Sequence, residues 1–357
     1  MTFCTLILDA PGPPLLFEEI DRFLEYDLAI TLNLHYFADP DSIIGHYGDR
    51  LRYAHINCHD KPALIAAIQQ NGGYSVLKTR LNIPLDGELI QAAASLANPL
   101  RAIAQAGVGV NHIDLQAARR SGVAVLNTPG SNAVAVAEYV LAQTLYLSRD
   151  LNQYNTETHK GHWSKGSLAP TAQIAELTLG LVGTGCIAQT VARKAQALGM
   201  NVMATGSERF TEQRARDLGL ERRATLEQLL DEADVVSIHT PLTPQTQGLF
   251  GSAAFARMRP GSILINTARG GIIDEDQLAS FMTRFPGHLK AVAIDTFARE
   301  KDQFNSPLAG IANAILTPHI AGNTRAAISQ ASRQIVDKIQ AFSRGDIVQD
   351  STPDIQV

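Results

Sequence analysis

The chain has little cysteine, a single tryptophan and no marked excess of either charge. The three cysteines among 357 residues, Cys4, Cys58 and Cys186, are far apart and odd in number. They predict neither a disulfide framework nor a metal site, and they favour a reducing compartment such as the cytoplasm. The net charge of -5 gives no basic surface for nucleic acid. Because the ten histidines lack zinc-binding spacing, no metal is expected either.

Long apolar runs are also missing. No segment approaches the roughly 18 apolar residues of a membrane span, so no membrane partner is expected. The N-terminal residues 1–14 have neither a basic start nor a small-residue cleavage site, and we interpret them as beginning with a strand. Apolar residues make up 45% of the chain and charged residues 18%, which is enough for buried cores. We therefore expect a cytoplasmic globular protein whose length suits two domains.

The second half of the chain alternates short apolar runs with helical stretches. Strands are predicted at 177–182, 201–204, 235–239, 262–266, 290–295 and 314–317. Helices are predicted between them at 187–198, 211–217, 226–232, 253–258 and 275–282. This order predicts a doubly wound parallel sheet of the dinucleotide-binding (Rossmann) type.

The first part of the chain shows the same alternation less completely. Strands are predicted at 74–77, 100–103 and 123–126, and helices at 86–96, 133–151 and 325–344. The last helix has no strand of its own, so we expect it to return to the first domain. The predicted fold class is α/β, with two doubly wound parallel-sheet domains. A cofactor domain, residues 130–323, is inserted into a discontinuous flavodoxin-like substrate domain, residues 1–129 and 324–357.

A glycine-rich segment follows the strand predicted at 177–182. Gly183 permits a tight turn, Gly185 lets the backbone approach a pyrophosphate, and Ala188 allows close contact between helix and strand. Free N–H groups at the start of the next helix, around Cys186 and Ile187, would face the phosphates. The segment therefore predicts a dinucleotide site.

The residues after the second strand of this domain bear on the choice of cofactor. An acidic residue that binds the ribose diol is usual there, but this chain has Gly206. Ser207 and Arg209 offer the donor and the positive charge that a 2'-phosphate needs, which favours NADP. The alternative is that Glu208 binds the ribose of NAD and that Arg209 is a solvated charge.

Polar groups follow consecutive predicted strands, at the edge where ligands of such sheets bind. They are His239-Thr240-Pro241, Asn266-Thr267-Ala268-Arg269, Asp295 and Thr317-Pro318-His319. Reduction of a 2-oxo acid needs a fixed cation for the carboxylate and carbonyl, which Arg269 can supply. It also needs a general acid, which His319 can supply with a carboxylate beside it. Glu300 is the leading candidate for that carboxylate, and Asp302 is the alternative.

The chain resembles the D-isomer-specific 2-hydroxy acid dehydrogenases from about residue 74 to residue 344. The segments that carry the resemblance are 106–114, 127–138, the glycine loop, 266–271, 295–300 and 317–322. The resemblance implies hydride transfer between NAD(P)H and C2 of a small 2-oxo or D-2-hydroxy acid. It implies a catalytic set of Arg269, Glu300 and His319.

The resemblance also implies binding roles for other residues. Backbone N–H groups of Val108 and Gly109 would bind the substrate carboxylate, and Lys78 or Arg80 would read a second anionic group. Asp295 would contact the nicotinamide carboxamide. Further cofactor contacts are expected from His239, Thr240, Pro241, Thr267, Ala268 and Gly322. A homodimer is expected as well, with the helix at 133–151 as a plausible contact.

Several features keep rival interpretations open. The Asp-Asn pair usual after the glycine segment is Asn111-His112 here, and Lys301 replaces a common proline. A nucleotide-sensing binding protein of the corepressor kind is disfavoured because all three catalytic residues are present. A formate-type dehydrogenase is disfavoured because its relatives have glutamine where Glu300 stands, and Val108 argues against phosphite oxidation. The sequence leaves the acid open among glyoxylate or hydroxypyruvate, phosphoglycerate and branched 2-oxo acids.

Overall fold

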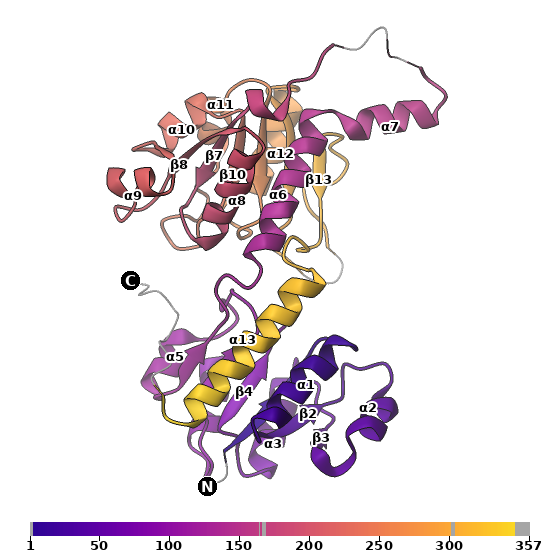
Figure 1. Cartoon of the computed structure of the whole chain (residues 1–357), viewed down its shortest axis with the longest axis vertical. Helices are drawn as coiled ribbons and strands as arrows, with labels where there is room; N and C mark the ends of the chain where they lie inside the picture. The colour runs from indigo at the N-terminus through magenta and orange to yellow at the C-terminus, as the bar shows by residue number, and fades with distance from the viewer. Residues whose placement is uncertain (1–2, 164, 166–168, 301–303, 347–357) are drawn as a thin grey trace. The chain divides into compact units, whose positions relative to one another are not determined.

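The computed structural model describes residues 3–163, 165, 169–300 and 304–346. The chain divides into two compact units (Figure 1). Unit 1 comprises Met1–Asn132 and Thr324–Val357, and unit 2 comprises Ala133–Asn323. The sequence-based boundary after residue 129 differs from this first junction, while the second junction falls between the same residues, 323 and 324.

Unit 1 is built on a six-stranded sheet in which every pairing is parallel. The strand order is β3-β2-β1-β4-β5-β6. The strands are β1 Cys4–Ile7, β2 Ala29–Asn33, β3 Arg52–Ala54, β4 Val76–Thr79, β5 Ala102–Gln105 and β6 Ala124–Leu126. The helices are α1 Leu15–Glu25, α2 Pro40–Tyr47, α3 Lys61–Gln70, α4 Gly87–Ala94, α5 Leu115–Arg120 and α13 Arg325–Ser343, with a short 3-10 turn, η1, at Gly48–Arg50.

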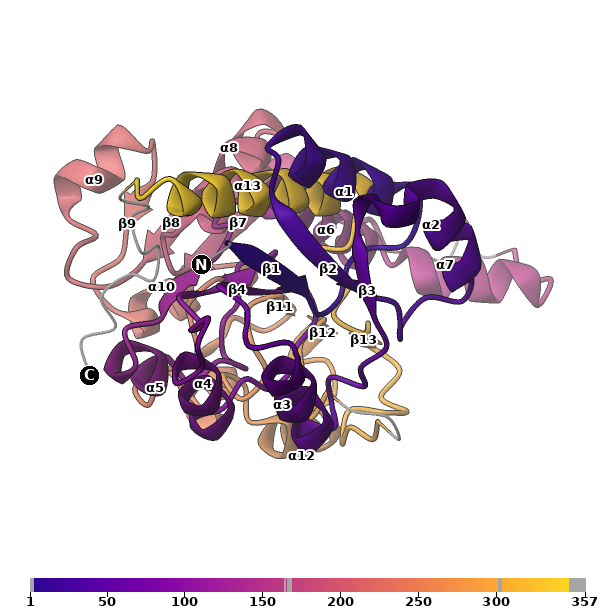
Figure 2. The same ribbon diagram turned by 90° about the horizontal axis from the view of Figure 1, so that it is seen from below.

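Helices cover both faces of this sheet, as Figure 2 shows. Helices α1 and α13 lie on one face, where Ile20, Phe23 and Ile335 are fully buried. Helices α3, α4 and α5 lie on the other face and bury a second apolar cluster. Aspartate side chains cap several of these helices by accepting a hydrogen bond from a backbone N–H in the first turn, at Asp39, Asp60, Asp86 and Asp114. Helix α13 therefore completes the sheet begun by the first third of the chain.

Unit 2 is built on a seven-stranded parallel sheet of order β13-β12-β11-β10-β7-β8-β9. The strands are β7 Thr178–Val182, β8 Asn201–Thr205, β9 Glu221–Arg222, β10 Val235–Ile238, β11 Ser262–Asn266, β12 Leu289–Ile294 and β13 Ala314–Leu316. The helices are α6 Ala133–Ser148, α7 Leu151–His159, α8 Cys186–Ala197, α9 Glu212–Asp217, α10 Leu226–Glu232, α11 Ser252–Arg257 and α12 Glu275–Arg284, with a 3-10 turn, η2, at Ile174–Glu176.

The two faces of the second sheet are also covered. Helices α6 and α8 pack on one face, and α10, α11 and α12 pack on the other. Gly180 in β7 is needed for the second contact, because a Cβ atom there would lie 2.6 Å from a methyl of Leu229. The predicted class of two doubly wound parallel sheets is confirmed.

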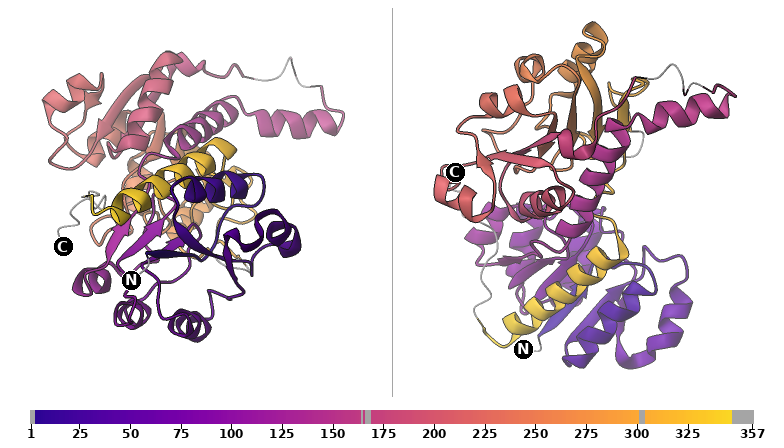
Figure 3. Two further views of the ribbon diagram at one scale, coloured as in Figure 1. Left: turned by 60° about the horizontal axis from the view of Figure 1, so that its bottom comes forward. Right: turned by 45° about the horizontal axis from the view of Figure 1, so that its top comes forward.

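Helix α7 extends away from the rest of unit 2 in both views of Figure 3. The predicted helix at 133–151 is two helices, because Asp150 adopts a left-handed backbone conformation with φ of 51°. None of the residues of α7 is buried. A helix of this length without a buried face gains little stability in water from its own hydrogen bonds.

Three other features differ from the sequence-based expectation. Strands β4 and β5 begin two residues later than predicted, at Val76 and Ala102. Strand β9 was not expected, and residues 1–73 hold three strands and three α-helices where the pattern suggested only a first strand. None of the helices in the described ranges is long and apolar enough to cross a membrane.

Candidate active site

The glycine loop of unit 2 lies between β7 and α8 and has the geometry of a phosphate cradle. Gly183 has φ of 108°, and a Cβ atom there would lie 2.7 Å from the carbonyl oxygen of His239. Only glycine combines this backbone conformation with so close an approach. A Cβ atom at Gly185 would meet nothing within 4 Å, so the space beside the N-terminus of α8 is open. The N–H groups at that terminus can receive a pyrophosphate.

The chain order reverses between β7 and β10, which makes their carboxyl ends the expected ligand position. His239 follows β10 and donates its backbone N–H to the carbonyl of Val182, at 2.8 Å. Burial lowers the pKa of the His239 imidazole to about 4, so the ring is neutral near pH 7. Its Nε2 lies 2.9 Å from the hydroxyl of Ser237. Thr240 and Pro241 follow His239 at the carboxyl end of β10.

The turn after β8 would hold the usual acidic side chain only tightly. A Cβ atom at Gly206 would lie 3.1 Å from the hydroxyl of Thr184 and 3.3 Å from Cβ of Phe210. A hydrogen bond of 2.8 Å from the Phe210 N–H to the Ser207 carbonyl closes the turn. The side chains of Ser207, Glu208 and Arg209 are all exposed on it.

The loop that carries Arg269 is fixed by its own backbone. Asn266, at the end of β11, accepts a hydrogen bond from the Ala268 N–H and donates one to the Arg269 carbonyl, both of 3.0 Å. A Cβ atom at Gly270 would lie only 1.8 Å from the carbonyl carbon of Phe297. The loop therefore lies directly against the segment after β12. Burial lowers the pKa of Arg269 and the charge of Glu300 raises it, but a guanidinium stays charged in proteins.

Glu300 and His319 form a hydrogen-bonded pair. The Nδ1 of His319 lies 2.8 Å from the Oε2 of Glu300. The other carboxylate oxygen of Glu300 accepts the N–H of Phe297 at 3.1 Å. Burial acts to raise the pKa of Glu300, but the hydrogen bond and charge of His319, the Phe297 N–H and the charge of Arg269 outweigh it and lower the pKa. Asp302, the alternative carboxylate, lies outside the described residues.

Asp295 lies behind this pair and holds the loop of His319. Its carboxylate accepts the hydroxyl of Thr317 at 2.6 Å and the N–H groups of Ile320 and Ala321 at 2.9 Å. His319 has φ of 55°, an uncommon conformation for a residue with a side chain. Asp295 is fully buried, and its carboxylate fixes the backbone of the loop that carries His319.

Other residues expected to bind the cofactor follow the ends of the same sheet. Thr267 is buried, and its hydroxyl finds no hydrogen-bond partner within the described chain. Ala268 follows it, and Gly322 lies three residues beyond His319 on the loop after β13. The buried Thr267 hydroxyl at the carboxyl end of β11 is thus available to a ligand. No group of three or more His, Cys, Asp or Glu residues in the described ranges is arranged to hold a metal ion.

The residues expected to bind substrate belong to unit 1. Val108 and Gly109 follow β5 and are half-buried, and Asn127 donates a hydrogen bond of 2.9 Å to the Val108 carbonyl. The prediction for Lys78 is wrong. Its side chain is fully buried, and its ammonium lies 2.6 Å from the carboxylate of Glu19. A charged amine that has lost its water needs such a partner and is not available to a ligand. Arg80 is only half-buried.

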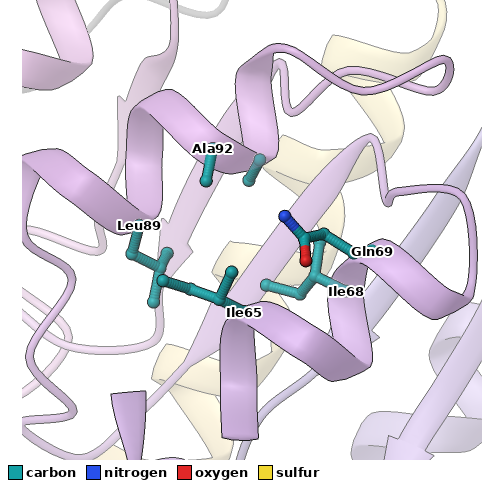
Figure 4. Close-up of a pocket in the computed structure, with 6 residues that line it drawn as sticks. Ile65, Ile68, Gln69, Leu89 and Ala92 are labelled. Carbon is teal, nitrogen blue, oxygen red and sulfur yellow. The ribbon is translucent and has the colours of Figure 1, made fainter. Parts of the chain in front are cut away.

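An apolar depression between α3 and α4 is a separate feature of unit 1 (Figure 4). It is lined by Ile65, Ile68, Gln69, Leu89, Ala92 and Ala93. It lies between the helices that cover one face of the sheet, whereas Val108 and Arg80 follow strand ends. It offers no cation for an acid.

Several residues that shape the site gave no signal in the sequence. Gly270 and Phe297 connect the loops of Arg269 and Glu300, yet neither carries a reactive group. Tyr139 lies on α6, and its hydroxyl is 2.6 Å from that of Thr317. Only the position of Thr317 in the Thr-Pro-His segment could have drawn attention to this hydrogen bond.

Comparison with known proteins supports the same assignment. Residues 141–321 match the family model described as "D-isomer specific 2-hydroxyacid dehydrogenase, NAD binding domain". The chain is 39% identical over 273 residues to the (S)-sulfolactate dehydrogenase of Chromohalobacter salexigens, covering 76% of this chain and 86% of that protein. It is 34% identical over 310 residues to the D-3-phosphoglycerate dehydrogenase of Mycobacterium tuberculosis. That match covers 87% of this chain but 56% of the relative, so the chain spans little more than half of that protein's length.

A solved structure is similar over nearly the whole chain. It is the TT0316 protein of Thermus thermophilus, with a TM-score of 0.75 and 30% identity. The alignment covers 96% of this chain and 98% of that one. The chain therefore belongs to the D-isomer-specific 2-hydroxyacid dehydrogenase family.

Proposed function

We propose that the chain transfers a hydride between a nicotinamide cofactor and C2 of a small 2-oxo or D-2-hydroxy acid. One observation carries the proposal: the Nδ1 of His319 lies 2.8 Å from the Oε2 of Glu300. The positive charge of Arg269 also acts on Glu300 and helps to lower its pKa. A cation, an imidazole and a carboxylate are the groups that such a reduction requires. All three belong to unit 2, which also carries the glycine loop.

The geometry of the pair supports a role for His319 as the proton donor. A carboxylate only accepts hydrogen bonds, so Nδ1 of His319 carries a hydrogen toward Glu300. Nε2 is then the atom that gives up a proton to the new alkoxide during reduction and takes it back during oxidation. Because the lowered pKa of Glu300 keeps it ionised near neutral pH, it stabilises the imidazolium and orients the ring.

Arg269 is proposed to bind the substrate carboxylate and polarise the carbonyl, since its planar guanidinium suits a carboxylate. In unit 1, the N–H groups of Val108 and Gly109 are proposed as substrate-binding groups, and Asn127 fixes the neighbouring Val108 carbonyl. When bound, the nicotinamide supplies or accepts the hydride. The chain supplies the phosphate cradle at Gly183 and Gly185.

The decisive experiment is a panel of 2-oxo acids assayed with NADH and NADPH. Glyoxylate, hydroxypyruvate, 3-phosphohydroxypyruvate and a branched 2-oxo acid cover the open substrate classes. We expect oxidation of the reduced cofactor with at least one of them. A protein that binds the cofactor but turns over none would be a binding protein of the corepressor kind, and turnover of formate alone would indicate a formate-type enzyme.

We further propose that NADP is preferred over NAD. Gly206 stands where a ribose-binding carboxylate is usual, and a Cβ atom there would be tight against Thr184 and Phe210. The exposed Ser207 and Arg209 offer a hydroxyl and a positive charge at that turn. Charge-assisted hydrogen bonds from such groups suit a 2'-phosphate.

The Ser207→Ala/Arg209→Ala double variant tests this preference. We expect the KM for NADPH to rise about tenfold to hundredfold, because a phosphate loses charged partners. The KM for NADH should change by less than about threefold, and steady-state kinetics with both cofactors measures the ratio. Glu208→Gln is the matched control: a rise in its KM for NADH would assign ribose binding to Glu208 and contradict the NADP proposal.

We propose a homodimer on the basis of α6 and α7. Val134, Leu145 and Leu151 are exposed at 53%, 40% and 47% of their surfaces, and α7 has no buried residue. Apolar side chains on a projecting helix gain stability when a second copy covers them. Sedimentation equilibrium is the direct check.

A reducing, cytoplasmic location is proposed as well, since Cys4, Cys58 and Cys186 are all free thiols.

A further inference from the structure

The glycine loop before α8 is held at its start by backbone contacts. The N–H of Gly183 donates to the carbonyl of Thr205, at the end of β8, over 2.8 Å. A Cβ atom at Gly183 would lie 2.7 Å from the His239 carbonyl oxygen, so this backbone is closely packed. These contacts fix the first residue of the loop. They do not fix the next peptide group, which joins Thr184 to Gly185.

That peptide group is held by a side chain of α8. The Nε2 of Gln189 donates to the Thr184 carbonyl at 2.8 Å. Helical side chains point toward the N-terminus of their helix, so the long side chain of Gln189, the fourth residue of α8, reaches back to the loop. No other described residue donates a hydrogen bond to the Thr184 carbonyl. Gln189 therefore sets the direction of this carbonyl.

The direction of the Thr184 carbonyl determines the direction of the next N–H. A trans peptide group is planar, and its C=O and N–H bonds point to opposite sides. The N–H of Gly185 therefore faces away from the side chain of Gln189. Within the described ranges this N–H makes no hydrogen bond, and the space beside Gly185 is open. It is a donor with a fixed direction.

The N-terminus of α8 has no cap of its own. Gly185 stands at the N-cap position without a side chain that could accept a hydrogen bond, and the first turn holds no acidic residue. Four helices of unit 1, in contrast, are capped by aspartate. Uncapped N–H groups at a helix N-terminus are suited to an anion. Gln189 thus orients one further donor next to these groups.

We propose that Gln189 is a positioning residue for the pyrophosphate of the cofactor. The inference rests on the cofactor binding in the proposed function and is independent of the acid that is reduced. Gln189 does not touch the cofactor. It holds the peptide group between Thr184 and Gly185 so that the Gly185 N–H can donate to a phosphate oxygen without first being ordered. A rotated peptide would present the Thr184 carbonyl, which cannot donate to a phosphate.

The Gln189→Met variant tests the proposal, because methionine keeps the length of the side chain and removes the donor. We expect the Kd values of NADH and NADPH, measured by calorimetry, each to rise about tenfold. The factor should be the same for both cofactors because both contain the pyrophosphate. This outcome differs from the one expected for Ser207→Ala/Arg209→Ala, which weakens NADPH far more than NADH.

Gln196→Met is the matched control. Gln196 also lies in α8, and its Nε2 also donates to a backbone carbonyl, but that carbonyl belongs to Gly219 and not to the glycine loop. The Kd values of this variant should stay within about twofold of the wild type, because distant sites act independently. Gln189→Ala should act in the same direction as Gln189→Met and serves where the methionine variant is unstable, since alanine favours a helix.

Phosphorus NMR of bound NADPH separates a local effect from a general one. The 2'-phosphate is an internal reference, because it is a separate group from the pyrophosphate. With the protein in excess, we expect the two pyrophosphate resonances of the Gln189→Met complex to move toward their positions in free NADPH. The 2'-phosphate resonance should stay where it is in the wild-type complex.

Three results would overturn the proposal. These are Kd values for Gln189→Met that equal those of the wild type, an equal loss of affinity in Gln196→Met, and a 2'-phosphate resonance that moves as far as the pyrophosphate resonances. A wild type that binds neither cofactor would overturn the proposal together with the proposed function. A wild type that binds a cofactor but turns over no acid would contradict the proposed function alone, and the comparison of Kd values would still decide the role of Gln189.

Discussion

Replacing His319 with asparagine is expected to lower kcat about 10²- to 10⁴-fold, the usual contribution of general acid–base catalysis. Asparagine suits the test because His319 has φ of 55°, a conformation that asparagine adopts more readily than most residues. The loop can then keep its hydrogen bonds to Asp295 while the proton donor is lost. The substitution His319→Gln removes the same proton donor but adds backbone strain.

Steady-state kinetics with the best 2-oxo acid measures this effect, and fluorescence titration of the reduced cofactor provides the control. The cofactor Kd should stay within about twofold, because the phosphate cradle at Gly183 and Gly185 is a separate segment of unit 2. A kcat within about threefold of the wild type would remove His319 from the reaction.

Gly270→Ala is expected to lower kcat/KM about 100-fold, although it adds a single methyl group away from the reacting atoms. A Cβ atom there would lie 1.8 Å from the carbonyl carbon of Phe297, so one of two backbone segments must move. One segment carries Arg269, and the other donates the N–H that fixes Glu300. A displacement of about 1 Å in positioning groups can cost roughly 10² in rate.

The measurement pairs kcat/KM with thermal unfolding. We expect Gly270→Ala also to lose about 1–3 kcal/mol of folding free energy, as overpacked sites do. Gly45→Ala is the matched control: it lies in α2, a Cβ atom there meets nothing within 4 Å, and its kinetics should equal those of the wild type. Wild-type kinetics for Gly270→Ala would show that the loops of Arg269 and Glu300 are not packed as described.

Much of unit 2 could be predicted from the sequence because its strands are short apolar runs that end in polar residues. The runs at 235–239 and 262–266 correspond to β10 and β11, and the polar residues after them lie at the edge where they were expected. Strands β4 and β5 were placed two residues too early. Tyr74 and Leu100 are buried and apolar like strand residues, so burial alone did not mark where pairing begins.

The first 73 residues were harder to predict for a physical reason. Strand β3 is a short edge strand whose residues are exposed or half-buried, so it lacks the apolar run that marks a buried parallel strand. In unit 2, strand β9 was missed for the same reason, because it consists only of Glu221 and Arg222 and has no apolar run. Lys78 was expected to bind an anion because its loop resembles a substrate-binding segment. Only the structure shows the partner Glu19, 59 positions earlier in the chain.

In the candidate site, too, some residues could be predicted from the sequence and others could not. Reactive groups such as Arg269 and His319 have recognisable chemistry and could be named from the sequence. The groups that orient them are backbone atoms or residues distant in sequence, such as the Phe297 N–H and Asp295. Their roles depend on three-dimensional proximity, which residue type and spacing do not encode.

Three hydrogen-bonded side chains join the middle of α6 to the loop of His319. The Tyr139 hydroxyl lies 2.6 Å from that of Thr317, which donates to Asp295 at 2.6 Å, and Asp295 accepts the two N–H groups that follow His319. The imidazole is thus tethered to a helix as well as to the strand that precedes it. Any shift of α6 along its axis would be transmitted to the proton donor, so whatever covers the exposed side of that helix can tune the chemistry without touching a substrate.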